Sequence, residues 1–73
     1  MNVVIKGNRV DNGELFEATV PCVNECTYRI TYADMYTKLM FLLGAVPEGN
    51  DCDPSKTSVF NHAHGKIYLE RGA

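Results

Sequence analysis

The residues of this chain that could do chemistry are three cysteines and two histidines. Cys22 and Cys26 are separated by three residues, and His62 and His64 by one. Thiolate and imidazole are ligands of tetrahedral zinc, and the cysteine spacing suits two ligands on one turn. The sequence therefore offers Cys22, Cys26, His62 and His64 as a candidate zinc site, and Cys52 lies between the two pairs.

These residues have a second interpretation, in which no metal or other cofactor is bound. Cys22 and Cys52 are then ordinary small apolar side chains, and the histidines are exposed residues of a turn. We favour this interpretation, because the H-x-H spacing is unusual for a structural zinc site and falls where a turn is predicted. Zinc is the alternative, since metal binding would stabilise a domain with a small core.

A cysteine and a histidine could also form a nucleophile and its base. Such a pair needs a lowered thiol pKa, a third orienting group and a cleft, and a single short sheet leaves little room for a cleft. The chain has no phosphate-binding, dinucleotide-binding or serine-hydrolase glycine motif, and its carboxylates are scattered singly. We therefore expect that the protein is not an enzyme.

Length and composition predict a single domain over residues 1–73, because the chain is short and 45% hydrophobic. The net charge of −2, with mixed signs, argues against nucleic-acid binding, which needs a basic stripe. No apolar run approaches the roughly 20 residues that span a bilayer, and the start of the chain has no signal-peptide pattern. Three cysteines, an odd count, fit a cytoplasmic protein with reduced thiols and no membrane contact.

The element that organises the chain is a predicted helix over residues 31–44. Thr31 is the expected N-cap, and Asp34 follows three residues later as in a weak capping box. Gly44 suits the left-handed residue after a helix, and Pro47 prevents continuation.

The helix has one broad apolar arc, formed by Tyr32, Met35, Tyr36, Leu39, Leu42 and Leu43. Phe41 falls among the polar residues of the opposite face. The simpler expectation is that a loop or the C-terminal segment covers Phe41. The alternative is that Phe41 and Met40 belong to a surface that meets another chain.

Strand-like segments surround the helix, at residues 3–10, 14–20, 27–30, 57–60 and 66–71. We expect a bulge at Gly7 in the first and a turn at Asn12–Gly13 after it. In the second, Phe16, Ala18 and Val20 are expected to face the core. The order β-β-β-α-β-β predicts an α+β fold, in which one amphipathic helix packs on one face of a small antiparallel sheet of four to five strands.

The other sheet face is expected to carry Tyr68, together with Arg9, Arg29, Glu17 and Glu70. Tyr and Arg often anchor protein interfaces, although exposed aromatic residues on a solvated sheet are the simpler expectation. Stacking of Tyr68 on single-stranded nucleic acid is disfavoured, because the chain shows no basic groove.

The chain also resembles, in general character, the compact accessory proteins of bacteriophages and mobile elements. Some of these, such as anti-CRISPR proteins, cover a surface of a larger host complex. That resemblance implies an inhibitor of a host defence complex and assigns no role to any residue.

We therefore expect a protein-binding module that acts by steric occupation of a partner. A zinc-stabilised domain and a homodimer built on the helix or on a sheet edge are the alternatives. The candidate partner-binding residues are Phe41, Met40, Tyr68, Arg29 and Arg71.

Overall fold

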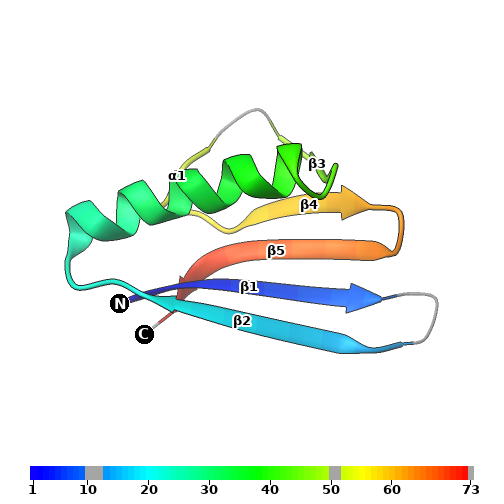
Figure 1. Ribbon diagram of the computed structural model, residues 1–73, viewed down its shortest axis with the longest axis horizontal. Coiled ribbons are helices and arrows are strands. Elements are labelled where there is room, and N and C mark those ends of the chain that lie inside the picture. The colour runs from blue at the N-terminus through cyan, green and yellow to red at the C-terminus, as the bar shows by residue number, and fades with distance from the viewer. Residues whose placement is uncertain (10–12, 50–51, 73) are drawn as a thin grey trace.

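The computed structural model describes residues 1–9, 13–49 and 52–72; the side chain of Arg9 and the Val10 end of the predicted first strand lie outside this description. One helix packs on one face of a five-stranded antiparallel sheet of order β2-β1-β5-β4-β3 (Figure 1). The elements are β1 (Asn2–Arg9), β2 (Leu15–Pro21), α1 (Glu25–Phe41), β3 (Val46–Pro47), β4 (Ser58–His62) and β5 (Gly65–Gly72). The predicted α+β class is confirmed, but the order is β-β-α-β-β-β.

The helix begins six residues earlier than the sequence predicted. Asn24 is the N-cap, and its side-chain oxygen accepts the backbone N–H of Thr27 at 2.8 Å. Residues 27–30 are therefore helical, and the predicted third strand and the predicted cap at Thr31 are wrong. Glu25 lies in the first turn, where a negative charge is favourable.

At the end of the helix, the prediction for Gly44 is confirmed, and the prediction that Leu42 and Leu43 belong to the buried apolar arc is wrong. Gly44 has φ of 67°, and the Ala45 N–H donates to the carbonyl of Leu39 at 2.9 Å, which turns the chain back toward β3. The helix ends at Phe41, so Leu42 and Leu43 are not held on the core face and are exposed. Phe41 is 78% exposed, so the expected cover over it is wrong.

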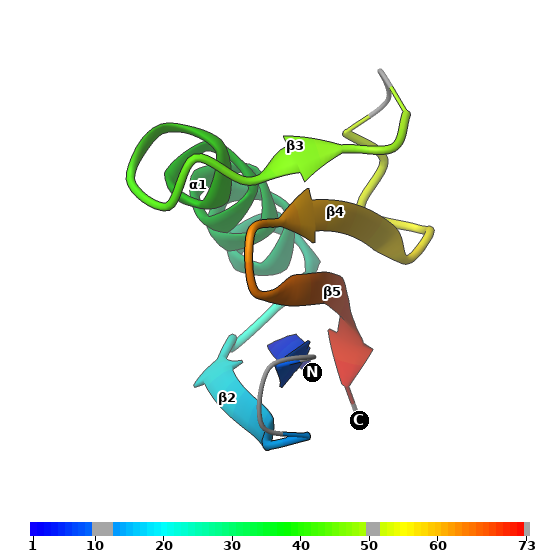
Figure 2. The same ribbon diagram turned by 90° about the vertical axis from the view of Figure 1, so that its right-hand side faces the viewer.

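The core lies between α1 and the three middle strands, as the end-on view shows (Figure 2). The helix contributes Tyr28, Tyr32, Tyr36 and Leu39, which recur at the spacing of one helical face. Fully buried residues of the sheet are Val3, Phe60 and Leu69.

Two helix tyrosines reach past the core to the segment before β4. The Tyr28 hydroxyl donates to the carbonyl of Pro54 at 2.9 Å. The Tyr32 hydroxyl donates to the carbonyl of Lys56 at 3.0 Å and also contacts the hydroxyl of Ser58. These bonds attach the long connection after β3 to the helix.

β1 and β2 pair without interruption. Gly7 stands opposite Phe16 on one side and Ile67 on the other, so the expected bulge is wrong. A Cβ on Gly7 would lie 1.9 Å from the Phe16 ring, so that ring occupies the space over the glycine. Gly7 is in the strand because only a residue without a side chain admits Phe16 there.

Phe16, Ala18 and Val20 face the helix side, since they pair with Gly7, Ile5 and Val3. However, Phe16 and Ala18 are exposed and Val20 is only half-buried. The helix lies over the middle of the sheet, so it leaves Phe16 and Ala18 on this side of β2 exposed. Within the part of the chain that the structure describes, no helix has the length and apolarity needed to cross a membrane.

Candidate functional site

The structure does not bring the two cysteines and two histidines together. Cys22 lies at the end of the sheet where its N–H donates to the Met1 carbonyl, and His62 pairs with Gly65 at the other end. β5 runs between these ends over seven residue steps, about 23 Å of extended chain. One zinc ion cannot bind all four residues, because its ligand atoms lie within about 2.3 Å. Among the described residues, no group of three or more potential ligands surrounds a common point.

The two histidines lie beside each other at the turn between β4 and β5. Their ring centroids are 5.5 Å apart, and the His64 N–H donates to Nδ1 of His62 at 3.4 Å. His62 is in β4 and not in the turn where it was predicted. The hollow beside them is open, and its described lining contains no cysteine.

Two of the candidate partner-binding residues are engaged within the molecule. The Arg71 guanidinium forms two hydrogen bonds with Glu25, at 2.6 and 2.9 Å, and lies 4.0 Å from the centre of the Tyr28 ring. Arg29 is on α1, not on the open sheet face, and its Nε lies 3.5 Å from the same carboxylate. The Arg71 hydrogen bonds lower the pKa of Glu25, and Arg71 thereby ties β5 to the start of the helix.

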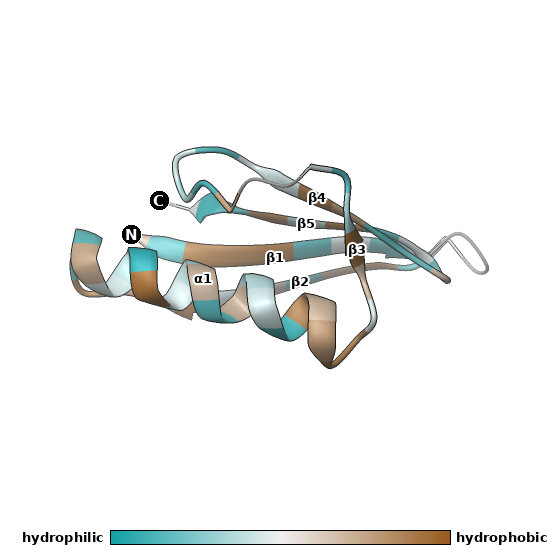
Figure 3. Ribbon diagram, turned by 90° about the horizontal axis from the view of Figure 1, so that it is seen from above, coloured by the Kyte–Doolittle hydropathy of each residue, from teal (hydrophilic) through white to brown (hydrophobic). Residues whose placement is uncertain are grey.

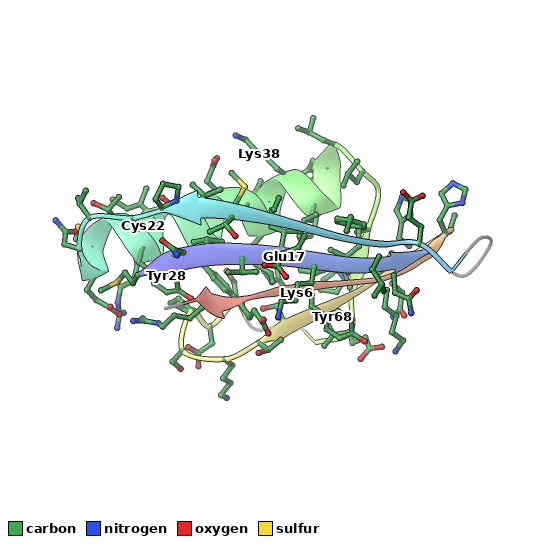
Figure 4. All side chains as sticks on the ribbon, turned by 90° about the horizontal axis from the view of Figure 1, so that it is seen from below. Lys6, Glu17, Cys22, Tyr28, Lys38 and Tyr68 are labelled. Carbon is green, nitrogen blue, oxygen red and sulfur yellow. The ribbon has the colours of Figure 1, made fainter. Side chains whose placement is uncertain are left out.

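Tyr68 lies on the sheet face opposite the helix, as predicted, because its neighbours Ile67 and Leu69 are buried under the helix. Figure 4 shows Tyr68 and Lys38 of α1 on opposite sides of the sheet. Tyr68 pairs with Lys6, whose Nζ lies 2.7 Å from the Glu70 carboxylate. The hydrogen bond that Lys6 donates to Glu70 raises the pKa of Lys6. This face is thus charged and internally paired around Tyr68.

The strongest concentration of exposed apolar side chains is at the end of α1. Three consecutive residues, Phe41, Leu42 and Leu43, are 78%, 75% and 53% exposed. Figure 3 shows hydrophobic colour at this end of the helix and in the segment that leads to β3. Met40 is half-buried and packs against the core.

Leu43 lines two hollows beside the end of α1. The first has a volume of about 220 Å³ and is lined by Ile5, Met35, Lys38, Leu39, Leu42 and Leu43. The second has a volume of about 170 Å³ and is lined by Asn8, Phe16, Leu43, His62, His64, Gly65, Lys66 and Ile67. We call these two hollows, together with Phe41, the helix-end surface.

Both lysines at the margins of the helix-end surface have acidic partners. Lys38 lies 3.0 Å from Asp34, and Lys66 lies 2.6 Å from Glu48. The hydrogen bond that Lys66 donates to Glu48 lowers the pKa of Glu48 and raises the pKa of Lys66. The rim is therefore polar and electrically balanced, whereas the centre is apolar.

Sequence reasoning identified Phe41 and Met40 but assigned Leu42, Leu43 and Phe16 to the core. The missed signal was Asn24, a good N-cap followed directly by Glu25. A helix that starts at Glu25 buries its three tyrosines against the sheet. The apolar residues at its other end, Leu42 and Leu43, then lie beyond the part that the sheet covers. Comparison of the chain with family models, curated proteins and solved structures finds no match.

Proposed function

We propose that this protein is a non-enzymatic protein-binding module that occupies a partner's surface through its helix-end surface. The observation that supports the proposal is the run Phe41–Leu43, in which three consecutive large apolar residues are exposed. Single exposed apolar residues are common, but contiguous apolar patches with a polar rim mark interaction sites.

The shape of the surface favours a macromolecular partner over a small ligand. Its two hollows, of about 220 and 170 Å³, are smaller than the roughly 300–1,000 Å³ of small-ligand clefts. An apolar centre with a charged rim is the arrangement of protein interfaces, in which a few buried side chains provide most of the binding energy. Leu43, which touches both hollows, is the expected anchor.

The expected cytoplasmic location and the expected inhibition of a host defence complex belong to this proposal. A protein that binds tightly to a functional surface and is large enough to cover it blocks that surface without any reaction. An anti-CRISPR-like inhibitor would act in that way. The helix-end surface would then be the part that contacts the host complex.

The proposal is tested with purified tagged protein and a lysate of the cells that produce it. Co-purifying proteins are identified, and their affinity is measured for wild type, Leu43→Ser and Phe41→Ser. Val23→Ser is the matched control, because Val23 is 89% exposed and lies at the other end of the helix.

We expect Leu43→Ser to weaken binding at least about tenfold and the control to leave it unchanged, since removing an interface anchor commonly costs more than 1 kcal/mol. Circular dichroism confirms that each variant is folded. Equal binding by all four proteins would contradict the proposal.

A further inference from the structure

β2 is one of the two edge strands of the described sheet, and its backbone orientation follows from one hydrogen bond. The Cys22 N–H donates to the Met1 carbonyl at 2.9 Å, in register with the β1–β2 ladder. In an antiparallel ladder, residues alternate between bonding the neighbouring strand and pointing away from it. The backbone groups of Val20, Ala18 and Phe16 therefore point to β1. Those of Leu15, Glu17, Thr19 and Pro21 point outward.

The outward side of β2 is suited to receive another strand. No described strand lies beyond β2, which is the lowest strand in Figure 1. Natural edge strands are usually protected by lysines, bulges or prolines in the strand. The β2 ladder with β1 is unbroken, and its single proline, Pro21, is the last residue. The middle of the edge, at Glu17 and Thr19, is left open.

We propose that two copies of this chain pair through β2, antiparallel, about a two-fold axis at Ala18. This makes one continuous ten-stranded sheet with both helices on the same side. The inference uses the edge of β2 and shares only Phe16 with the helix-end surface, so either proposal can fail alone.

Two requirements limit the register. Opposed residues must lie on the same sheet face, and residues that bond each other must both point outward. Centring on Ala18 meets both requirements and places all seven residues of β2 opposite β2 of the partner copy. Centring on Glu17 instead would place two like charges directly opposite each other, which is unfavourable.

Side chains are complementary in the register centred on Ala18. On the helix side, Phe16 stands opposite Val20 of the second copy, an aromatic and β-branched pair of the kind that stabilises sheets. On the other side, Glu17 stands opposite Thr19, whose hydroxyl can donate to the carboxylate. Leu15, which is 74% exposed in the monomer, stands opposite Pro21.

The size of the contact predicts weak association. Seven residues from each copy are about a third of the 20–30 residues per side in a standard interface. Backbone hydrogen bonds and the Phe16–Val20 contacts provide most of the attraction. We therefore expect a dimer that is populated at high protein concentration and dissociates on dilution.

The test is disulfide trapping of the proposed register. Ala18 is exposed, and opposite its copy it would form a non-hydrogen-bonded pair with Cα atoms about 4.5 Å apart, within disulfide range. Ala18→Cys is compared with Thr19→Cys, whose two copies would lie about 7–8 Å apart, and with Ala33→Cys on the exposed helix face. All three carry Cys26→Ser and Cys52→Ser, which remove the exposed native thiols.

After mild oxidation we expect about tenfold more covalent dimer for Ala18→Cys than for either comparison variant. Preferential linking of Thr19→Cys would overturn the register, and equal linking of all three would overturn the dimer. If Ala18→Cys does not fold, sedimentation equilibrium of the wild-type protein decides whether the chain dimerises. A mean mass that rises toward two chains with concentration supports pairing, and a monomer throughout refutes it.

Discussion

Removing the hydroxyl of Tyr32 should destabilise the fold about twice as much as removing that of Tyr28. Tyr32 is fully buried, and its hydroxyl lies at the point where α1, β5 and the segment before β4 meet. It donates to the Lys56 carbonyl at 3.0 Å, contacts the Ser58 hydroxyl and lies 3.4 Å from the Leu69 carbonyl. Tyr32→Phe removes all of these contacts at once and keeps the ring.

The expected cost follows from the burial of these groups. Removing one partner of a buried hydrogen bond costs about 1–3 kcal/mol, because the group left behind is not resolvated. We take about 2 kcal/mol for Tyr32→Phe, which lowers the Tm of a chain of this length by about 8–16 °C. Tyr28→Phe removes the partly buried hydrogen bond to Pro54 and should cost about 1 kcal/mol.

Urea unfolding followed by circular dichroism measures both variants against wild type. The slope of the unfolding free energy with urea should not change, since the surface exposed on unfolding is the same. Refutation would be a Tyr32→Phe variant as stable as wild type, or a Tyr28→Phe variant that loses more than Tyr32→Phe. Either result would mean that the Tyr32 hydroxyl does not attach the helix to the connection before β4.

Three further predictions concern the sheet surface, the start of the helix and the response to acid. Gly7→Ala should cost about 1 kcal/mol, because the new Cβ displaces the Phe16 ring, and the cost should vanish in a Phe16→Ala background. A double-mutant cycle by thermal unfolding checks this, and an unchanged cost in that background would contradict it. Asn24→Ala should cost about 1 kcal/mol by removing the cap, measured as the fall in the urea midpoint; a variant as stable as wild type would mean that the cap contributes nothing. Arg71 lowers the pKa of Glu25 below its ordinary value of 4.5, so the pair stabilises the fold above about pH 4.5 and that contribution is lost as the pH falls through the lowered value. Unfolding free energies from about pH 7 to about pH 3 should therefore fall more steeply for wild type than for Glu25→Gln, and parallel curves would count against the pair.

The sheet could be predicted from sequence because its signals are local. Alternation, β-branched residues and the glycine-containing turns located four of the five strands to within about two residues at each end. β3 could not be predicted, since it has only two residues, Val46 and Pro47, and exists because Gly44 turns the chain onto β4.

The start of the helix was misplaced because local and tertiary preferences disagree. Thr27, Tyr28 and Ile30 favour strands when considered alone. In the fold, Tyr28 is needed on the helix, one turn before Tyr32, to fill the core at the end of the sheet. Tertiary packing therefore overrides local propensity in that stretch.

The candidate surface could be predicted only in part. Phe41 was recognisable because it interrupts the polar side of the helix. Leu42 and Leu43 continue the apolar arc on a helical wheel, and only the position of the helix end removes them from the core. The positions of Cys22 and His62 at opposite ends of the sheet depend on strand order, which no local pattern contains.

β1 and β5 are the first and last elements of the chain, yet they lie side by side and Asn2 stands opposite Gly72. During synthesis on a ribosome, β1, β2 and α1 emerge well before the strand that joins them to β4. The apolar faces of the earlier elements therefore stay unmatched until β5 has been synthesised, and chaperones could bind them before then. Closure of the sheet must wait for β5, and a chain that stops before Gly65 would lack the strand that joins β1 to β4.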